Sequence, residues 1–417
     1  MRTYRELFRA GEFTPLLLAS AGQTAAQTLG GPALGLLVFR RTGSPFLSSL
    51  AMFGPALGQL VGAVTVLSAA DRLPPRAALT GVALLLGAGT AALAVPGMPL
   101  WALFPVLLAL GVAGAVGGGA RYGLLDDILA RDGRLLGRSV LGMSAGVLQI
   151  CGFAAGGVLV TVLSPRGTLL VAAALHLLSA GVARFGLGRR PARASGRPSV
   201  AETWRTDVLL WSSVPRRYVY LALWVPNGLI VGAEALYVPY SPHGSGLLFA
   251  CGALGMLAGD AVVGRFLPAR RREGWVVPLC VLLAAPYLFF LLEPGLPVAV
   301  ALVTVATFGY ATGLLLQDRL MELTPGRLAG QALGLHTSGM LAMQGVGAAV
   351  AGALAESTSP ATGMAATAAL SLAVTLLLAP GLRSGGRTGG RTGGPRGRLR
   401  RIPRWNPQRD LRREPSG

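Results

Sequence analysis

Apolar segments and arginines alternate along this chain in the way that a membrane protein requires. All 37 basic residues are arginines, and they gather in every second gap between apolar stretches. Charged residues make up only 13% of the chain, against about 25% in soluble domains. A run of roughly 17–25 apolar residues is long enough to cross a bilayer as a helix. We therefore predict an all-α membrane protein with twelve transmembrane helices. They are expected at 13–38, 46–69, 77–95, 99–120, 138–163, 167–186, 218–240, 244–263, 275–292, 296–315, 329–354 and 361–380.

The arginines also indicate on which side of the membrane each connection lies. The N-terminal segment, the tail and alternate connections are rich in arginine, whereas the opposite connections hold only Arg40, Arg41 and Arg166. Connections with many positive charges stay in the cytoplasm. We therefore expect both termini in the cytoplasm, as an even number of spans requires. The predicted location is the cell membrane, as a multi-pass protein.

Composition and spacing argue against several kinds of function. A net charge of +20 lies in loops and the tail, so anionic lipids of the cytoplasmic leaflet are the expected partners and nucleic acid is not. The three cysteines lie in apolar stretches without metal-ligand spacing. A chain without lysine has no P-loop lysine and no Schiff-base lysine. The pattern at 142–146 matches a serine-hydrolase elbow, but it lies inside a predicted membrane helix. We expect no metal, no cofactor and no enzymatic activity.

A shift of 193 residues aligns the first part of the chain with the second. The matched pairs are Gly62 and Gly255, Arg72 and Arg265, Pro75 and Pro268, Arg134 and Arg327, Gly137 and Gly330, Gly146 and Gly339, and Gly152 and Gly345. The ordered set indicates a duplication, although any one pair could arise by chance. Parallel six-span repeats are typical of transporters that bind substrate between two halves. We predict six-helix, pseudo-symmetric halves at 1–186 and 218–380.

The segments outside the two halves are polar. Residues 187–217 are expected to form a cytoplasmic linker, in which 199–212 is predicted to be an amphipathic helix at the lipid interface. Its apolar face would carry Val200, Trp204, Val208 and Trp211. The tail at 381–417 has Gly-Gly-Arg-Thr repeats and no core-forming run, which predicts a disordered basic segment. Contact with anionic lipid is the favoured role of the tail, and a nucleic acid or a protein partner is the alternative.

Three local motifs resemble those of the major facilitator superfamily, over residues 10–382. The loop after the second span holds Asp71, Arg72 and Arg76, similar to the loop motif of this family, but with prolines at 74 and 75 in place of the family residues. The turn at 42–45 reads Thr-Gly-Ser-Pro, and 152–157 reads Gly-Phe-Ala-Ala-Gly-Gly. Both are similar to motifs of the drug-exporter branch, although Phe153 replaces a proline.

The resemblance implies a secondary transporter that works by alternating access, without a cofactor and as a monomer. Resemblance to the exporter branch implies efflux of a small amphipathic compound in exchange for protons. The alternatives are an importer of a small metabolite and a receptor or scaffold built on the same fold, which would not transport.

A gate at the cytoplasmic side is expected to involve Asp71, Arg72, Arg76 and Arg121. In the family, the loop carboxylate pairs with an arginine of the fourth span, and an ion pair formed in one state only shifts the equilibrium between states. The alternative is that Asp71 and Arg121 merely end their helices at the membrane boundary.

Ionisable residues inside the spans are candidates for proton coupling, because charges in the hydrocarbon are costly. These are Glu234 in the seventh span, Asp260 in the eighth and His176 in the sixth. Glu234 is the first choice, since the seventh span lines the central cavity in this family. The alternatives are an interfacial carboxylate for Glu234, a gate role with Arg265 for Asp260, and a structural hydrogen bond for His176.

Uncharged polar residues are candidates for the wall of a substrate cavity. Gln23 and Gln27 lie one turn apart on the first span and share a face. Asn227 follows Pro226 in the seventh span. Hydrogen bonds between helices are the alternative, because such groups need partners inside the bundle. The glycines at 54, 58 and 62 predict a packing stripe rather than a binding motif.

The expected gate pair can be tested by a double-mutant cycle. Asp71→Asn, Arg121→Ala and the double variant are compared by initial transport rate. If the two side chains interact, the losses are non-additive, with a coupling of about 0.5–3 kcal/mol. Fully additive losses would show that the two residues act independently.

Overall fold

Helices account for nearly all of the structure of this chain. The computed structural model describes residues 4–65, 73–129, 131–191, 207–325 and 328–384, and these residues contain no strand. The helices are α1 (Tyr4–Phe8), α2 (Phe13–Thr42), α3 (Pro45–Thr65), α5 (Pro75–Leu93), α6 (Leu100–Ile128), α7 (Arg131–Gly186), α9 (Val214–Ala235), α10 (Tyr237–Tyr240), α11 (Ser245–Phe266), α12 (Ala269–Ala284), η1 (Ala285–Leu292), α13 (Leu296–Phe308), η2 (Gly309–Ala311), α14 (Thr312–Glu322), α15 (Ala329–Ser357) and α16 (Pro360–Ser384).

The prediction of twelve membrane-crossing helices is confirmed. Nine helical segments of the described residues are long and apolar enough to cross a membrane. One of them, Leu136–Gly186, is two helices joined at Ser164, whose φ is 77°. The residue before a proline is disfavoured in a helix, so Pro165 explains this break between the fifth and sixth spans. The first two spans are α2, of 30 residues, and α3, of 21 residues.

Three spans of the second half are broken where the sequence predicts continuous helices. The seventh span ends as the short helix α10, the ninth changes to the 3₁₀ helix η1, and the tenth contains the 3₁₀ turn η2. Pro286 lies at the start of η1, where its missing N–H favours the change. At η2, a side chain on Gly309 would collide with the backbone of Leu283 in α12. Each of these three short segments contains a tyrosine: Tyr237 in α10, Tyr287 in η1 and Tyr310 in η2.

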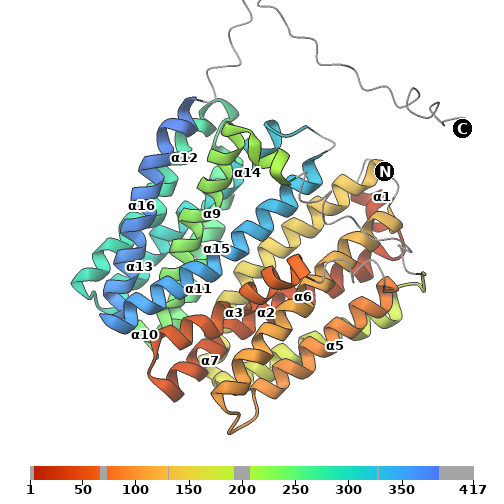
Figure 1. The fold of residues 1–417 in the computed structure, drawn as a ribbon, viewed down its shortest axis with the longest axis horizontal. Coiled ribbons are helices and arrows are strands. Elements are labelled where there is room, and N and C mark those ends of the chain that lie inside the picture. The colour runs from red at the N-terminus through yellow and green to blue at the C-terminus, as the bar shows by residue number, and fades with distance from the viewer. Residues whose placement is uncertain (1–3, 66–72, 130, 192–206, 326–327, 385–417) are drawn as a thin grey trace, which may run out of the picture.

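The two six-helix halves converge at one end of the molecule and separate at the other (Figure 1). At the converged end a single core cluster joins both halves, from Leu36 and Met52 to Tyr237 and Phe249. At the opposite end the buried clusters are separate. One belongs to the first half and surrounds Leu124, and the other belongs to the second half. The separated end is the one that carries the N-terminus and α14 (Figure 1).

Small residues bring the halves into backbone contact at the converged end. A Cβ atom on Gly157 of α7 would lie 2.6 Å from the carbonyl oxygen of Gly246 in α11. A Cβ atom on Gly352 of α15 would lie 2.8 Å from the Cα of Phe46 in α3. The fifth span therefore touches the eighth, and the second span touches the eleventh. Larger side chains at Gly157 or Gly352 would push the two halves apart.

The linker and tail are described only in part. Residues 192–206 and 385–417, and with them Val200 and Trp204, lie outside the described residues. Residues 207–212 are helical, as predicted. However, Trp211 stacks on Trp224 of α9 with ring centroids 5.7 Å apart, so this side chain contacts the bundle. Helix α16 continues to Ser384, so the first four residues of the expected tail, 381–384, are helical.

The predicted glycine stripe on α3 contacts α6 at two of its three positions. A Cβ atom on Gly58 would lie 2.9 Å from the Cα of Gly111, and one on Gly62 would lie 2.9 Å from the Cα of Val112. A Cβ atom on Gly54 would meet nothing within 4 Å. The stripe therefore holds the second and fourth spans together, and Gly54 takes no part in this contact.

This difference predicts opposite outcomes for one substitution at two glycines of the same helix. Gly58→Val should lower the free energy of unfolding by about 1–3 kcal/mol, because overpacking forces the helix backbones apart. Gly54→Val should have a much smaller effect. The thermal midpoint of the detergent-solubilised protein measures both, and an equal loss at the two positions would show that the backbone contact at Gly58 is not what matters.

Candidate functional site

Four aromatic side chains form a continuous layer across the converged end. We call Phe153, Phe249, Tyr237 and Tyr287 the aromatic layer. Phe153 of the first half stacks on Phe249 of the second, with ring centroids 6.2 Å apart. Phe249 meets the ring of Tyr237 edge-on at 5.0 Å, and the Tyr237 and Tyr287 hydroxyl groups share a hydrogen bond. The layer links the two halves and fills the space between them.

Glu234 lies against this layer, three residues before Tyr237. Both Tyr237 and Tyr287 are close enough to interact electrostatically with its carboxyl group. The hydroxyl group of Tyr310 in η2 also lies within reach of that carboxyl group. Yet Glu234 Oε1 and the Tyr310 hydroxyl are both buried without a hydrogen-bond partner in the described part of the chain.

The breaks in the spans explain how this cluster forms. Tyr237, Tyr287 and Tyr310 lie in α10, η1 and η2, the three segments that interrupt regular helices of the second half. Glu234 is in the last turn of α9, directly before one of these breaks. A change of helix type alters the direction of the side chains that follow. The breaks thus gather three phenols around one carboxyl group.

The unpartnered oxygen atoms mark this cluster as a candidate functional site. Buried polar groups in folded proteins almost always have a partner, and an ionised carboxylate in hydrocarbon is costly without one. Glu234 therefore either carries a proton in this conformation or needs a hydrogen-bond donor, for which the Tyr310 hydroxyl group is the nearest candidate in the described part of the chain.

The polar candidates from the sequence lie at different depths of the interface. Asn227 is seven residues before Glu234 and on the same face of α9, and its Oδ1 atom accepts a hydrogen bond of 3.3 Å from Gln344 Nε2 in α15. On α2, Gln23 is half-buried and Gln27 is exposed. Gln27 lies one turn before Gly31, which faces Met52 and Phe153. Gln27 is therefore next to the aromatic layer on the side of the separated end.

The other two ionisable candidates are not near Glu234. His176 is buried in the second part of α7, and its Nδ1 atom has no partner among the described residues. Asp260 is half-buried on α11. Within the described residues it makes no hydrogen bond or ion pair, including with Arg265. The structure thus groups Glu234 with tyrosines rather than with the other candidate acids and bases.

The gate residues are only partly visible. Asp71 and Arg72 lie outside the described residues. Arg76 is half-buried at the start of α5. The guanidinium group of Arg121 lies 5.0 Å from the ring centre of Tyr122, and its Nε atom is buried without a partner among the described residues. Arg121 therefore retains an N–H group that could donate a hydrogen bond to a carboxylate.

A contact between the halves at the converged end was not expected from the sequence. The carboxylate of Glu356, at the end of α15, accepts hydrogen bonds of 2.8 Å from the Ser44 hydroxyl and 3.2 Å from the Phe46 N–H. Ser44 also accepts a bond from the Leu47 N–H. In the Thr-Gly-Ser-Pro turn, Gly43 takes the left-handed conformation that ends α2. Ser44 caps the N-terminus of α3, and Pro45 is the first residue of that helix. Glu356 adds a second cap from the other half.

Several residues of the site were missed because their sequence signals are weak. Tyrosines inside apolar spans are common, but Pro286-Tyr287 and Gly309-Tyr310 each combine a helix breaker with a phenol. Gln344 is one of several polar residues in a helix that is rich in small side chains. Glu356 is at the end of a span, where an acidic residue needs no special explanation. Only proximity in the fold distinguishes these residues.

Comparisons with known proteins agree on the fold. A family model described as Major Facilitator Superfamily matches residues 16–317. A search of curated proteins finds no match. A bacterial homolog of the human lysosomal transporter Spinster, inward-facing and occupied, has a TM-score of 0.67 at 15% identity, covering 91% of this chain and 97% of its own. A peptide transporter in complex with sulfate gives 0.66 at 14% identity, with coverages of 89% and 94%.

A third solved structure is the nucleoside transporter NupG. Its TM-score is 0.63 at 13% identity, covering 89% of this chain and 99% of its own. At such identities the likeness shows a shared fold. The family match and the fold together support a multi-pass membrane protein that transports, rather than an enzyme.

The bond between Glu356 and α3 predicts a measurable shift of conformation. A carboxylate at an exposed helix N-terminus contributes about 0.3–1 kcal/mol, so Glu356→Gln should reduce the population closed at this end by about two- to fivefold. Spin labels at Arg41 and Thr358 would report the distance between the halves. Glu293→Gln removes a charge from the loop between η1 and α13, which makes no hydrogen bond or ion pair with the described residues of the first half, and serves as the control. Equal distance distributions for Glu356→Gln and the unsubstituted protein would exclude this capping role.

Proposed function

Because this chain belongs to the Major Facilitator Superfamily, we propose that it is a secondary transporter that exports a small amphipathic compound in exchange for protons. The observation that carries the proposal is Glu234, a buried carboxyl group with an unpartnered oxygen next to the aromatic layer. The remaining parts of the proposal concern orientation, coupling and direction.

The described conformation is proposed to be open to the cytoplasm. The halves separate at the end that carries the N-terminus, and the positive-inside rule assigns that end to the cytoplasm. The aromatic layer and the Glu356 cap would then close the outer side in the cell membrane. In the opposite state the halves would part at the aromatic layer and meet near Asp71 and Arg121. The N-terminal half (1–186), linker (187–217), C-terminal half (218–380) and tail (381–417) are the proposed moving and connecting parts.

Proton coupling is proposed to operate through the position of Glu234 next to the layer. While the layer is closed, the carboxyl group is shielded from water, and its neutral form costs less than its charged form. Opening the layer would separate Phe153 from Phe249 and admit water from the outer side, from which the carboxylate takes up a proton. After the layer closes, exchange requires that the proton leaves toward the open cytoplasmic side, and the Tyr310 hydroxyl group is placed to donate to the resulting carboxylate. The protonation of Glu234 and the conformation of the halves would thus be linked.

The exporter direction rests on the resemblance of the 152–157 motif to the drug-exporter branch, and this motif makes close contacts at the converged end. Side chains on Gly152 and Gly156 would collide with Thr28 and Leu29 of α2, and a side chain on Gly157 would collide with Gly246 of the other half. The motif thus packs the fifth span against both the first span and the opposing half. This is the contact that must break when the outer side opens. Asp260 and His176 remain secondary candidates for protonation.

The substrate is proposed to bind between the aromatic layer and the open end. Gln23 and Gln27 are on the first-half wall, and Asn227 is on the second-half wall together with Gln344. Hydrogen-bonding amides on two otherwise apolar walls suit a compound with both polar and lipophilic parts.

Transport by inverted membrane vesicles tests the proposal. Acidifying the vesicle interior should drive accumulation of fluorescent amphipathic dyes, and a protonophore should abolish it. Glu234→Gln keeps the shape of the side chain but cannot exchange a proton, so accumulation should fall to that of vesicles without the protein. Glu293→Gln, an acid outside the cluster, should retain the unsubstituted rate.

Three outcomes would contradict parts of the proposal. Unchanged proton-driven accumulation by Glu234→Gln would remove this residue from the coupling mechanism. Accumulation in right-side-out vesicles instead would indicate an importer. No gradient-dependent flux of any dye or metabolite would favour a receptor or scaffold.

A further inference from the structure

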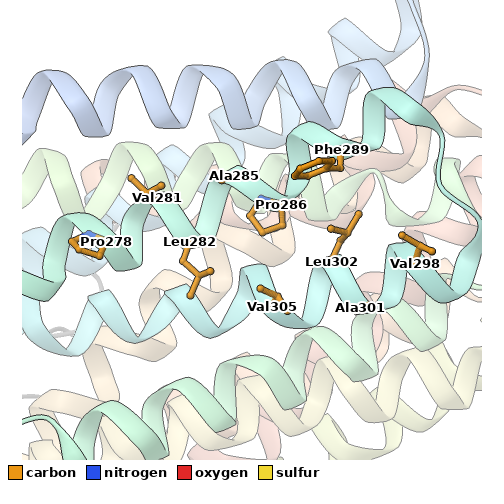
Figure 2. A pocket seen from close by; sticks show the side chains of 10 residues that line it. All are labelled: Pro278, Val281, Leu282, Ala285, Pro286, Phe289, Val298, Ala301, Leu302 and Val305. Carbon is orange, nitrogen blue, oxygen red and sulfur yellow. The ribbon is translucent and has the colours of Figure 1, made fainter.

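An apolar groove runs along the outer face of the second half. It lies between the ninth span, made of α12 and η1, and the tenth span, which begins with α13. Its volume is about 440 Å³. The side chains that line it include Val281, Pro286 and Phe289 on one side and Val298, Leu302 and Val305 on the other. Figure 2 shows these side chains on the two facing helices.

The first half has a matching groove between α5 and α6. Its volume is about 510 Å³, and its lining is also apolar. The 193-residue shift relates five of the eight lining positions of this groove to lining positions of the second-half groove. Leu85 matches Pro278, Leu108 matches Ala301, and Val112 matches Val305. The grooves are therefore a feature of the repeat and do not arise from one irregular helix.

Proline and alanine explain why the second-half helices leave room between them. Pro278 and Pro286 remove backbone donors from the ninth span, and the span narrows to the 3₁₀ helix η1 after Ala284. Ala285 and Ala301 also line the groove, and these small side chains leave its floor empty. The space is open along its length to the surroundings of the bundle.

The second-half groove has a cationic end that the first-half groove lacks. Arg271 and Trp275 are exposed and lie seven and three residues before Pro278, on the same face of α12. The neighbouring Arg272 is paired with Asp318 at 2.7 Å. Arg271 makes no ion pair with any described residue. Its charge is therefore available to a ligand that lies along the groove.

At the matching positions the first half carries apolar side chains. Arg271 corresponds to Ala78, and Trp275 corresponds to Val82. Arg76 is nine residues before Leu85, which places it on the opposite side of α5. The chain thus contains two grooves of similar size and lining, of which only the second-half groove has an arginine and a tryptophan at the end formed by the start of its first helix.

We propose that the groove between α12–η1 and α13 binds one acyl chain of an anionic phospholipid, whose phosphate is held by Arg271. Trp275 lies between the two parts of the ligand, at the depth of the headgroup boundary where tryptophan is favoured in membranes. Arginine binds phosphate through several donors. The matching groove of the first half binds acyl chains without preference for the headgroup.

The lining and the location favour lipid over transported substrate. The groove faces away from the interface between the halves, and its exposed side chains include Phe289 and Val298. No charged side chain lines it. A ligand there would contact the outer wall of one half and would be held equally in both states of the interface.

Lipid retention measured by native mass spectrometry tests the proposal. The full chain is released from nanodiscs that contain equal amounts of phosphatidylglycerol and phosphatidylcholine. The unsubstituted protein should retain one phosphatidylglycerol preferentially. Arg271→Gln should reduce that preference about fivefold, the effect expected from one arginine near an anionic headgroup. Ala301→Phe should fill the groove and abolish retention.

Two matched variants serve as controls. Arg265→Gln removes an exposed arginine from the same end of the molecule but from α11, and it should leave retention unchanged. Ala109→Phe fills the first-half groove and should not alter the preference for phosphatidylglycerol. If Ala301→Phe fails to fold, Arg271→Gln at an exposed position still decides the question.

Other outcomes would overturn the proposal. Equal losses in Arg271→Gln and Arg265→Gln would indicate diffuse attraction of anionic lipid to the whole basic end. Equal retention of phosphatidylcholine would show that the headgroup is not recognised. A dimer that Ala301→Phe abolishes would assign the groove to a second copy of the chain.

Discussion

The structure depends on one constraint: a polar group inside the hydrocarbon has partners only within the protein. Helical backbones satisfy their own hydrogen bonds, so twelve of them can cross the membrane. Polar side chains must be paired one by one, as Asn227 is with Gln344. Among the described polar atoms that lack a partner, Glu234 Oε1 and the Tyr310 hydroxyl lie next to the layer that joins the halves. The constraint that shapes the fold therefore also marks Glu234 as a candidate functional residue.

The breaks in the second half connect the fold with this site. In continuous α-helices, the directions of Tyr237, Tyr287 and Tyr310 would follow the helical repeat of about 3.6 residues. The short segments α10, η1 and η2 interrupt this repeat and bring the three side chains to one carboxyl group. The same break at Pro286 opens the groove on the outer face. One departure from helical geometry thus serves an interior cluster and an exterior binding surface.

The repeat adds a comparison that few chains offer. Both halves have an apolar groove at matching positions, but the ends of the two grooves differ in charge. The shared packing is what a duplication would produce, whereas Arg271 and Trp275 occur in the second half only. The two halves also contribute unequally to the aromatic layer. The first half supplies only Phe153, and the second half supplies Phe249, Tyr237 and Tyr287.

The sequence by itself determined the class of fold, the twelve spans and the two-half design. Span length, apolar runs and repeated loop motifs depend on local chemistry, and each can be read without knowing which helices touch. It also singled out Glu234, because a carboxylate within a span is costly wherever it lies. Only the tertiary structure decided that Glu234 faces tyrosines and that Glu356 caps a helix of the other half. It also decided that Gly58 packs against the backbone of α6 whereas Gly54 does not. The physical reason is that these facts depend on contacts between residues far apart in the chain, and no local pattern encodes which faces of two distant helices will meet.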